Sequence, residues 1–301
     1  MSTPAITIDD PIEPAGVGEP MRQRQWKVLV GATLRQWRAR IGLLIFVVMV
    51  LIALAGPLIA PHHPNEFVTA PNGPSTSQAL FGGDNLGRDV WSRFLYGGRT
   101  VLGMSAAATI IGVVLGLVVG LTAAYMSGLV DEVLMRIADV FMAFPQIVLA
   151  LLLLTAFQSS VTLIVLIVGL SHAPRVARVI RGAAQQVVER DFIKAAEAVG
   201  EPRRRIIFGE LMPNVTSPLL VEVGLRLTYS IGLIAAINFL GVGLQPPTSD
   251  WGLMIQDNRL AVSVQPWGVL LPVIAIALLT IGTNLLTDGF ARAAIGIDRG
   301  E

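Results

Sequence analysis

The sequence has no cysteine, only three histidines and only two lysines among its 301 residues. The lack of cysteine excludes disulfides, thiolate catalysis and cysteine-based zinc sites. A phosphate-binding loop ends in Gly-Lys-Ser/Thr, and neither Lys27 nor Lys194 follows a glycine, so the chain lacks this ATP-binding motif. His62 and His63 are either metal ligands or a solvated dipeptide before Pro64, and the ligand count favours the second interpretation.

Charge is scarce as well. Charged residues make up 14% of the chain and hydrophobic residues 53%, and the mean hydropathy is +0.67. Soluble domains ordinarily carry about 25% charged residues. We therefore expect an all-α membrane protein in which the helices form one unit. The formal net charge of +1 gives no reason to expect a nucleic-acid partner.

Long uncharged runs predict six membrane-spanning helices, because about 20 apolar residues at 1.5 Å each cross a hydrocarbon core of about 30 Å. The expected spans are 41–60, 100–125, two helices within the uncharged stretch 140–174, 215–240 and 267–286. The alternative for the first run is a cleaved signal peptide, since Ala53-Leu54-Ala55 resembles a cleavage site. The long basic lead and the continuation of the apolar run argue against cleavage.

The other segments are expected outside the membrane. Residues 1–40 are predicted to form a tail and a basic interfacial segment, with residues 1–20 disordered. An outer loop is expected at 61–99 and a tail at 291–301. The core is expected at 100–290 and contains a charged segment at 181–214. Seventeen Lys and Arg fall on the side of the amino terminus and four in the loops of the opposite side. Because cytoplasmic segments hold the excess of basic residues, both termini are expected in the cytoplasm.

Small residues recur in the second span. Gly112, Gly116 and Gly120 are spaced four apart, and small residues at this spacing let another helix approach closely. We therefore predict that a second helix packs tightly on this ridge.

The charged segment contains a short amphipathic helix, expected over 192–202. Asp191 can cap it, and Gly200 followed by Pro202 ends it. Its apolar face comprises Phe192, Ala195, Ala196 and Val199. That face needs a surface to cover it. Two interpretations are equally supported: the face packs on its own bundle or on headgroups, or it docks on a partner.

Polar residues within the spans are expensive and therefore of interest. Glu222 and Arg226 are four residues apart with the acid first, which favours a self-neutralising structural pair over a role in a translocation pathway. Asn238 and Asn284 either line such a pathway or bond across helices, and the second interpretation is preferred.

Four stretches resemble a known family. Lys194-Ala-Ala-x-x-x-Gly200 followed by Met212-Pro213 resembles the EAA loop of binding-protein-dependent ABC importer permeases, with Lys194 in place of Glu and Met212 in place of the frequent Leu. Further stretches resemble its dipeptide/oligopeptide/nickel branch, of the DppC/OppC type: 81–93 (FGGDNLGRDVWSR), 139–145 (DVFMAFP) and 238–252 (NFLGVGLQPPTSDWG).

The resemblance implies the six-helix fold of a type I ABC importer permease, in which the 192–202 helix is a coupling helix seated on a separate ATPase. The coupling residues would be Phe192, Lys194, Ala195, Ala196, Glu197, Val199, Gly200 and Arg203. Arg203, Arg204 and Arg205 would flank the ATPase or contact headgroups. The chain would have no cofactor of its own, since ATP and magnesium would bind the ATPase subunits.

The same resemblance implies the partners and the location. These are a homologous second permease, two ABC ATPase domains, an external substrate-binding protein and membrane lipid, in the bacterial plasma membrane. The expected function is import of short peptides, with nickel or another small solute as the alternative. A secondary transporter is less favoured, because the 191–213 pattern has no second copy and few carboxylates lie in the spans. A membrane enzyme or scaffold would need a catalytic set, and none converges in the sequence.

Overall fold

The computed structural model of the chain describes residues 30–298, with side-chain surroundings up to residue 294. The disordered tail predicted for residues 1–20 lies outside this range. The long helices are α2 (Trp37–Ile59), α3 (Val90–Met126), α6 (Val161–Val188), α10 (Thr216–Phe239) and α12 (Trp267–Asp298). The shorter helices are α4 (Gly128–Ala143), α5 (Gln146–Ala156), α7 (Asp191–Ala198), α8 (Arg203–Arg205), η1 (Ile206–Leu211), α9 (Met212–Asn214), α11 (Trp251–Asn258) and η2 (Arg259–Ala261).

The predicted all-α membrane fold is confirmed. The five long helices are each long and apolar enough to cross a membrane, and α4 and α5, bent by 81° at the break between them, make a sixth if the pair is one broken span. α4 begins at Gly128, before the uncharged stretch 140–174 in which both helices were expected. The break lies at Phe144 and Pro145, where Phe144 has an extended backbone. Proline disfavours a helical conformation in the residue before it and cannot donate a backbone hydrogen bond, so the helix ends there.

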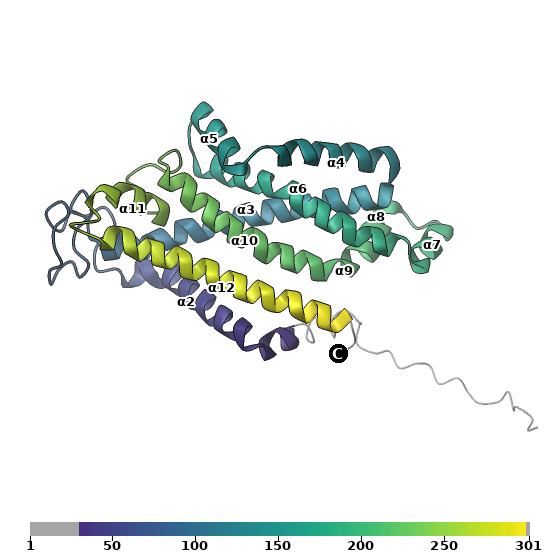
Figure 1. The fold of residues 1–301 in the computed structure, drawn as a ribbon, viewed down its shortest axis with the longest axis horizontal. Coiled ribbons are helices and arrows are strands. Elements are labelled where there is room, and N and C mark those ends of the chain that lie inside the picture. The colour runs from purple at the N-terminus through teal and green to yellow at the C-terminus, as the bar shows by residue number, and fades with distance from the viewer. Residues whose placement is uncertain (1–29, 299–301) are drawn as a thin grey trace, which may run out of the picture.

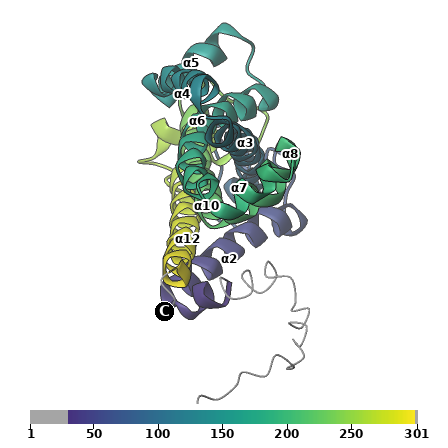
Figure 2. The same ribbon diagram turned by 90° about the vertical axis from the view of Figure 1, so that its right-hand side faces the viewer.

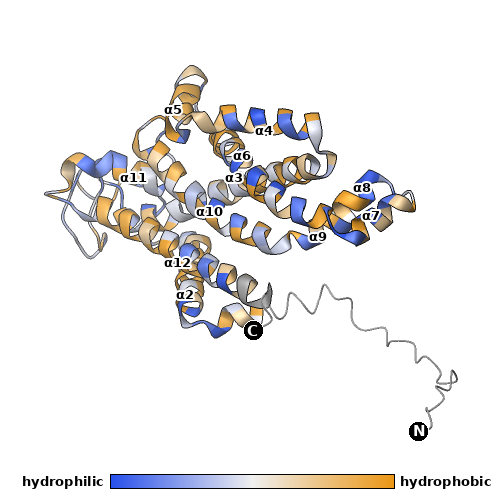
Figure 3. Ribbon diagram, turned by 45° about the vertical axis from the view of Figure 1, so that its right-hand side comes forward, coloured by the Kyte–Doolittle hydropathy of each residue, from blue (hydrophilic) through white to orange (hydrophobic). Residues whose placement is uncertain are grey.

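The two ends of the bundle are distinct. Figure 1 shows α11 and the loop at 60–89 at one end, called the outer end below, and α7 and α8 at the opposite end. Figure 2 shows the bundle viewed from the α7 end. In this view α2 and α12 lie side by side on one side of α6, and α4 and α5 lie on its opposite side. Figure 3 shows hydrophobic residues along the long helices and hydrophilic residues gathered at both ends. This distribution is typical of a protein whose ends face water and whose middle faces lipid.

The start of α3 differs from the prediction. Residues 90–99, expected in the outer loop, form its first turns, because Asp89 caps the helix at Val90. The Asp89 carboxylate accepts hydrogen bonds from the backbone N–H of Ser92 at 2.8 Å and from its hydroxyl at 2.6 Å. The outer loop therefore ends at Asp89 rather than at residue 99.

α6 is also longer than predicted. It continues to Val188, so the first residues of the charged segment expected at 181–214 lie on this helix. Arg178 forms an ion pair with Asp139, and Arg181 pairs with Asp131. Both acids belong to α4, so opposite charges on the neighbouring helix allow α6 to continue past its apolar part. At the chain ends, α2 begins at Trp37 and α12 runs to Asp298, beyond the predicted limits of both spans.

The glycine ridge of α3 packs against α6, as predicted. A Cβ atom added at Gly116 would lie 2.7 Å from the carbonyl oxygen of Ala173 and 2.7 Å from Cγ1 of Val176. Cβ atoms at Gly112 and Gly120 would lie 2.7 and 2.6 Å from carbonyl oxygens of the same helix. The backbones of α3 and α6 therefore approach more closely than any residue with a side chain at these positions would allow.

Candidate coupling surface, central groove and outer polar network

Helix α7 lies at the charged end of the bundle and is shorter than the predicted 192–202. Arg190 is its N-cap, so Asp191 is the first helical residue rather than the cap. Gly200 has φ +77°; its N–H donates to the carbonyl of Glu197, and the N–H of Glu201 donates to Ala196, each at 3.0 Å. These are the two hydrogen bonds of a Schellman motif, so Gly200 ends the helix as predicted.

The predicted apolar face of α7 is divided between two surroundings. Ile193, which was not in that face, is 1% exposed and packs in a cluster with buried residues of α6 and η1. Ala196 is half-buried against the same cluster. Phe192, Ala195 and Val199 remain exposed, Val199 by 79%. One edge of α7 therefore packs on its own bundle, and the other edge, called the coupling face below, is open.

The coupling face borders a shallow groove between α7 and η1. Its volume is about 260 Å³, and its lining includes Ala195, Val199 and Arg205. Lys194 and Glu197 of α7 and Arg203 of α8 are exposed as well. Arg205 pairs with Glu201 at 3.3 Å, the arginine being 70% exposed, so the pair contributes little to stability. The surroundings of the open apolar edge are thus charged and solvated.

A larger groove, called the central groove below, lies among α5, α10 and α12. Its volume is about 540 Å³. It is lined by Gln146 and Ile147 of α5, Leu225, Thr228, Tyr229, Gly232 and Leu233 of α10, and Thr280 and Asn284 of α12. Of the four residues considered for a pathway, Asn284 is therefore the one that lines this groove, and its side chain is exposed.

Glu222 and Arg226 form the predicted pair on α10. Arg226 Nε lies 3.0 Å from Glu222 Oε2, and both side chains are buried. The guanidinium carbon of Arg226 lies 5.1 Å from the ring centroid of Tyr229, which lines the central groove. The Nη1 atom of Arg226 is buried and has no hydrogen-bond partner within residues 30–294. The pair is neutral as a whole, but its cation lies directly behind one wall of the groove.

A chain of polar contacts crosses the bundle near this groove. Thr109 Oγ1 lies 3.1 Å from Ser230 Oγ, which lies 3.0 Å from His172 Nε2. Gln146 Nε2 lies 3.4 Å from His172 Nδ1, and Arg175 Nη1 donates to Gln146 Oε1 at 3.3 Å. This chain was not predicted, because its five residues are isolated polar positions spread over four apolar helices, α3, α5, α6 and α10. No spacing within one segment indicates such a contact.

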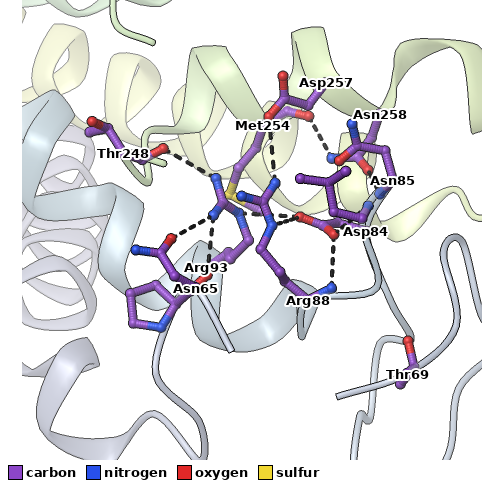
Figure 4. A network of polar contacts seen from close by, with 12 residues as sticks. Asn65, Thr69, Asp84, Asn85, Arg88, Arg93, Thr248, Met254, Asp257 and Asn258 are labelled. Carbon is purple, nitrogen blue, oxygen red and sulfur yellow. Dashed lines mark hydrogen bonds and ion pairs between the residues drawn. The ribbon is translucent and has the colours of Figure 1, made fainter. Parts of the chain in front are cut away.

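The outer end holds a buried network of charges, shown in Figure 4. Asp84 Oδ2 lies 2.7 Å from Arg88 Nε and 3.4 Å from Arg93 Nε. Arg88 Nη2 lies 3.8 Å from Asp257 Oδ2, and Arg93 Nη2 donates to the carbonyl of Thr248 at 3.1 Å. The network joins the outer loop and α3 to α11 and the segment before it. Because buried charges are tolerated only when paired, it fixes these elements together.

Asn238 belongs to this outer end and not to the central groove. It is fully buried; its Nδ2 donates to Asp250 Oδ1 at 2.9 Å and its Oδ1 accepts from the N–H of Leu244 at 2.9 Å. Asp250 Oδ1 also caps α11 through the N–H of Leu253 at 3.1 Å. Asn238 thus bonds across elements, which was the preferred interpretation, whereas Asn284 lines the central groove and Arg226 lies behind Tyr229 of its wall.

Asp250 gives the outer end a predicted pH dependence. Burial raises the pKa of its carboxyl from 3.8 to about 6, and hydrogen bonds from Leu253 and Asn238 offset this only in part. Because the folded-state pKa lies above the unfolded one, the stabilising contribution is complete below pH 3.8 and is lost as the pH rises through 6. A shift of about two units corresponds to a free energy on the order of 3 kcal/mol.

We therefore expect the unfolding temperature of the detergent-solubilised protein to fall between pH 5 and pH 7.5, and Asp250→Asn to flatten this dependence. The variant has no proton to lose in that range, and its amide oxygen can still accept from Leu253. The measurement is a thermal unfolding series across these pH values for both proteins. Equal pH slopes for the variant and the wild type would contradict the assignment.

Comparison with known proteins gives matches over most of the chain. Residues 112–295 match the family described as "Binding-protein-dependent transport system inner membrane component", and residues 24–76 match "N-terminal TM domain of oligopeptide transport permease C". The dipeptide transport system permease protein DppC of Alkalihalophilus pseudofirmus is 34% identical, covering 85% of this chain and 84% of the relative.

A second relative and a solved structure agree with these matches. The glutathione transport system permease protein GsiD of Shigella dysenteriae is 34% identical, covering 86% of each chain. A solved chain of the MetNI methionine ABC transporter in an inward-facing conformation has a TM-score of 0.51 and 18% identity, covering 66% of this chain and 96% of the other. The latter shows a shared fold.

Proposed function

Because this chain belongs to the family of binding-protein-dependent transport system inner membrane components, we propose that it is the permease subunit through which an ABC importer takes up short peptides. The family and the fold make it a multi-pass inner-membrane permease of an ABC importer. The peptide class is supported by the names of the relatives, one for dipeptides and one for glutathione, which is a tripeptide. These names favour peptides over the nickel alternative.

The observation that carries the mechanism is the coupling face of α7. Phe192, Ala195 and Val199 are exposed on a helix that Ile193 holds against the bundle. An apolar edge presented on a fixed helix at the hydrophilic end of the bundle fits a groove on another protein. We propose that this protein is an ABC ATPase, which binds ATP and magnesium, and that its movement on nucleotide binding tilts the spans through α7.

The same arrangement supports a set of further partners and an orientation. The central groove is lined by helices of this chain alone, and a homologous second permease with its own ATPase domain would complete the pathway. An external binding protein would deliver peptide to the outer end. The start of α2 and the end of α12 lie at the α7 end, where Gln36 Nε2 donates to the carbonyl of Gly289 at 3.2 Å. Both termini would then be cytoplasmic.

Substitution of Gly200 tests the coupling proposal. Gly200→Val strains the backbone at φ +77° although an added Cβ would meet nothing within 4 Å. Left-handed backbone costs about 1–2 kcal/mol for such residues, so the end of α7 unwinds and the coupling face turns away. In proteoliposomes containing the whole complex and its binding protein, we expect peptide uptake and peptide-stimulated ATP hydrolysis to fall by about fivefold.

Gly200→Asn is the matched control, because asparagine adopts the left-handed region more readily than valine. It is expected to retain more than half of the wild-type uptake. Both variants are expected to assemble with their partners, as measured by copurification. Full uptake with Gly200→Val would remove α7 from the coupling mechanism.

A further inference from the structure

Helix α5 begins inside the membrane-spanning part of the chain. Its N-cap is Pro145, which makes no side-chain hydrogen bond to the first turn. The first amides of a helix have no partner within the helix, and they form the positive end of its dipole. Gln146 and Ile147 of this first turn line the central groove. The positive end of α5 therefore lies at the groove rather than at the membrane surface.

Arg226 adds a second positive element at the same place. Its side chain is 7% exposed, and Nη1 has no hydrogen-bond partner among the described residues. Residues 222, 226, 229 and 233 follow one side of α10 by helical spacing, and Tyr229 and Leu233 line the groove. Arg226 therefore has spare hydrogen-bonding capacity immediately behind the ring of Tyr229.

Arg175 is the third positive element. It is half-buried on α6 and donates to Oε1 of Gln146, a residue of the groove wall. Across residues 30–294, no carboxylate lies within ion-pair distance of Arg175. Arg175 and Arg226 carry two positive charges, and Glu222, the ion-pair partner of Arg226, carries one negative charge. The region around the groove therefore has an excess positive charge. In an apolar surrounding such an excess attracts an anionic group strongly.

We propose that the central groove binds the free carboxylate of a peptide in transit, with Arg175, Arg226 and the first amides of α5 as its donors. The proposal rests on the proposed function and names the chemical group that the pathway recognises. Broken helices in other transporters direct their N-terminal ends at substrate carboxylates in the same way. A volume of about 540 Å³ is adequate for a small peptide. Tyr229 separates Arg226 from the groove, so rotation of its side chain would admit the carboxylate.

The absence of cysteine permits a direct test of this site. Asn284→Cys places one thiol on the groove wall, and its labelling by a maleimide is followed on this subunit in the purified complex without the binding protein. We expect millimolar dialanine to slow labelling at least threefold and dialanine amide to leave it unchanged. In the background of Arg175→Gln the protection is lost, and with Arg175→Lys it is retained. Thr280→Cys reports from the same wall if Asn284→Cys does not assemble.

Arg175 is chosen because no acid of the described chain lies within ion-pair distance of it, and Glu222 keeps its ion pair with Arg226 when Arg175 is replaced. No protection by dialanine, equal protection by the amide, or full protection in Arg175→Gln each overturns the proposal. Peptide uptake by the wild-type complex in proteoliposomes tests the proposed function separately. Protection from labelling without peptide uptake would contradict the proposed function but support the carboxylate site. Uptake without protection would support the proposed function and overturn the carboxylate site.

Discussion

Replacing Ala195 by glutamate is expected to reduce ATP-driven peptide uptake below one twentieth of the wild-type rate, while the permease remains folded. Ala195 is exposed at the centre of the coupling face and lines the shallow groove beside η1. A surface substitution of this kind changes stability by about 0.5 kcal/mol or less. Seated against an ATPase, however, the carboxylate would be buried without a partner, and this costs several kcal/mol. The measurements are copurification of the ATPase subunits, ATP hydrolysis and peptide uptake.

Ala198→Glu is the matched control for this variant. Ala198 is also exposed on α7, but helical spacing places it beside the line of Phe192, Ala195 and Val199 rather than on it. It is expected to retain at least half of the uptake. The unfolding temperatures of both variants are expected to match that of the wild type. Equal losses in the two variants, or undiminished copurification with Ala195→Glu, would show that the coupling face is not the ATPase-binding surface.

Gly116→Leu is expected to prevent accumulation of the folded permease, and Gly116→Ala to lower its stability by about 1–3 kcal/mol. Even a methyl group at this position would lie 2.7 Å from the carbonyl oxygen of Ala173. That atom belongs to the backbone of α6, so the two helices must separate. The measurements are the yield of monodisperse protein after solubilisation and its unfolding temperature.

Gly103→Ala is the control on the same helix. A Cβ at Gly103 would meet nothing within 4 Å, and alanine is favoured over glycine inside a helix by about 1 kcal/mol. Its unfolding temperature is therefore expected to equal or exceed that of the wild type. A similar loss at both glycines would mean that glycine itself, and not the close approach of α6, matters for stability.

Hydropathy predicted where the chain crosses the membrane, but not where its helices begin and end. Arg93 was assigned to the outer loop, because hydropathy does not show that its charge is compensated. Asp84 neutralises Arg93, and Asp89 caps α3, so the helix begins before its apolar part. Arg181 extends α6 in the same way, since Asp131 on α4 pairs with it. Helix ends that depend on tertiary charge pairs cannot be predicted from one segment.

The coupling helix could be located from its pattern, while the division of its faces could not. Periodicity grouped Phe192, Ala195, Ala196 and Val199, but which edge is covered depends on where α7 lies on η1 and α6. Ile193 is buried for that reason. The central groove was not predictable either, because its walls come from three separate helices and its few polar residues are scattered among them.

The buried charges of the outer end have an evolutionary consequence. Asp84, Arg88, Arg93 and Asp257 each have their charge compensated by another member of the set. Loss of one leaves another buried and unpaired, which is strongly unfavourable, whereas removal of a whole pair is tolerated far better. The effect of a substitution at one position therefore depends on the residue present at the others. These four positions are constrained to change together, so sequence drift in this part of the chain proceeds by compensated steps.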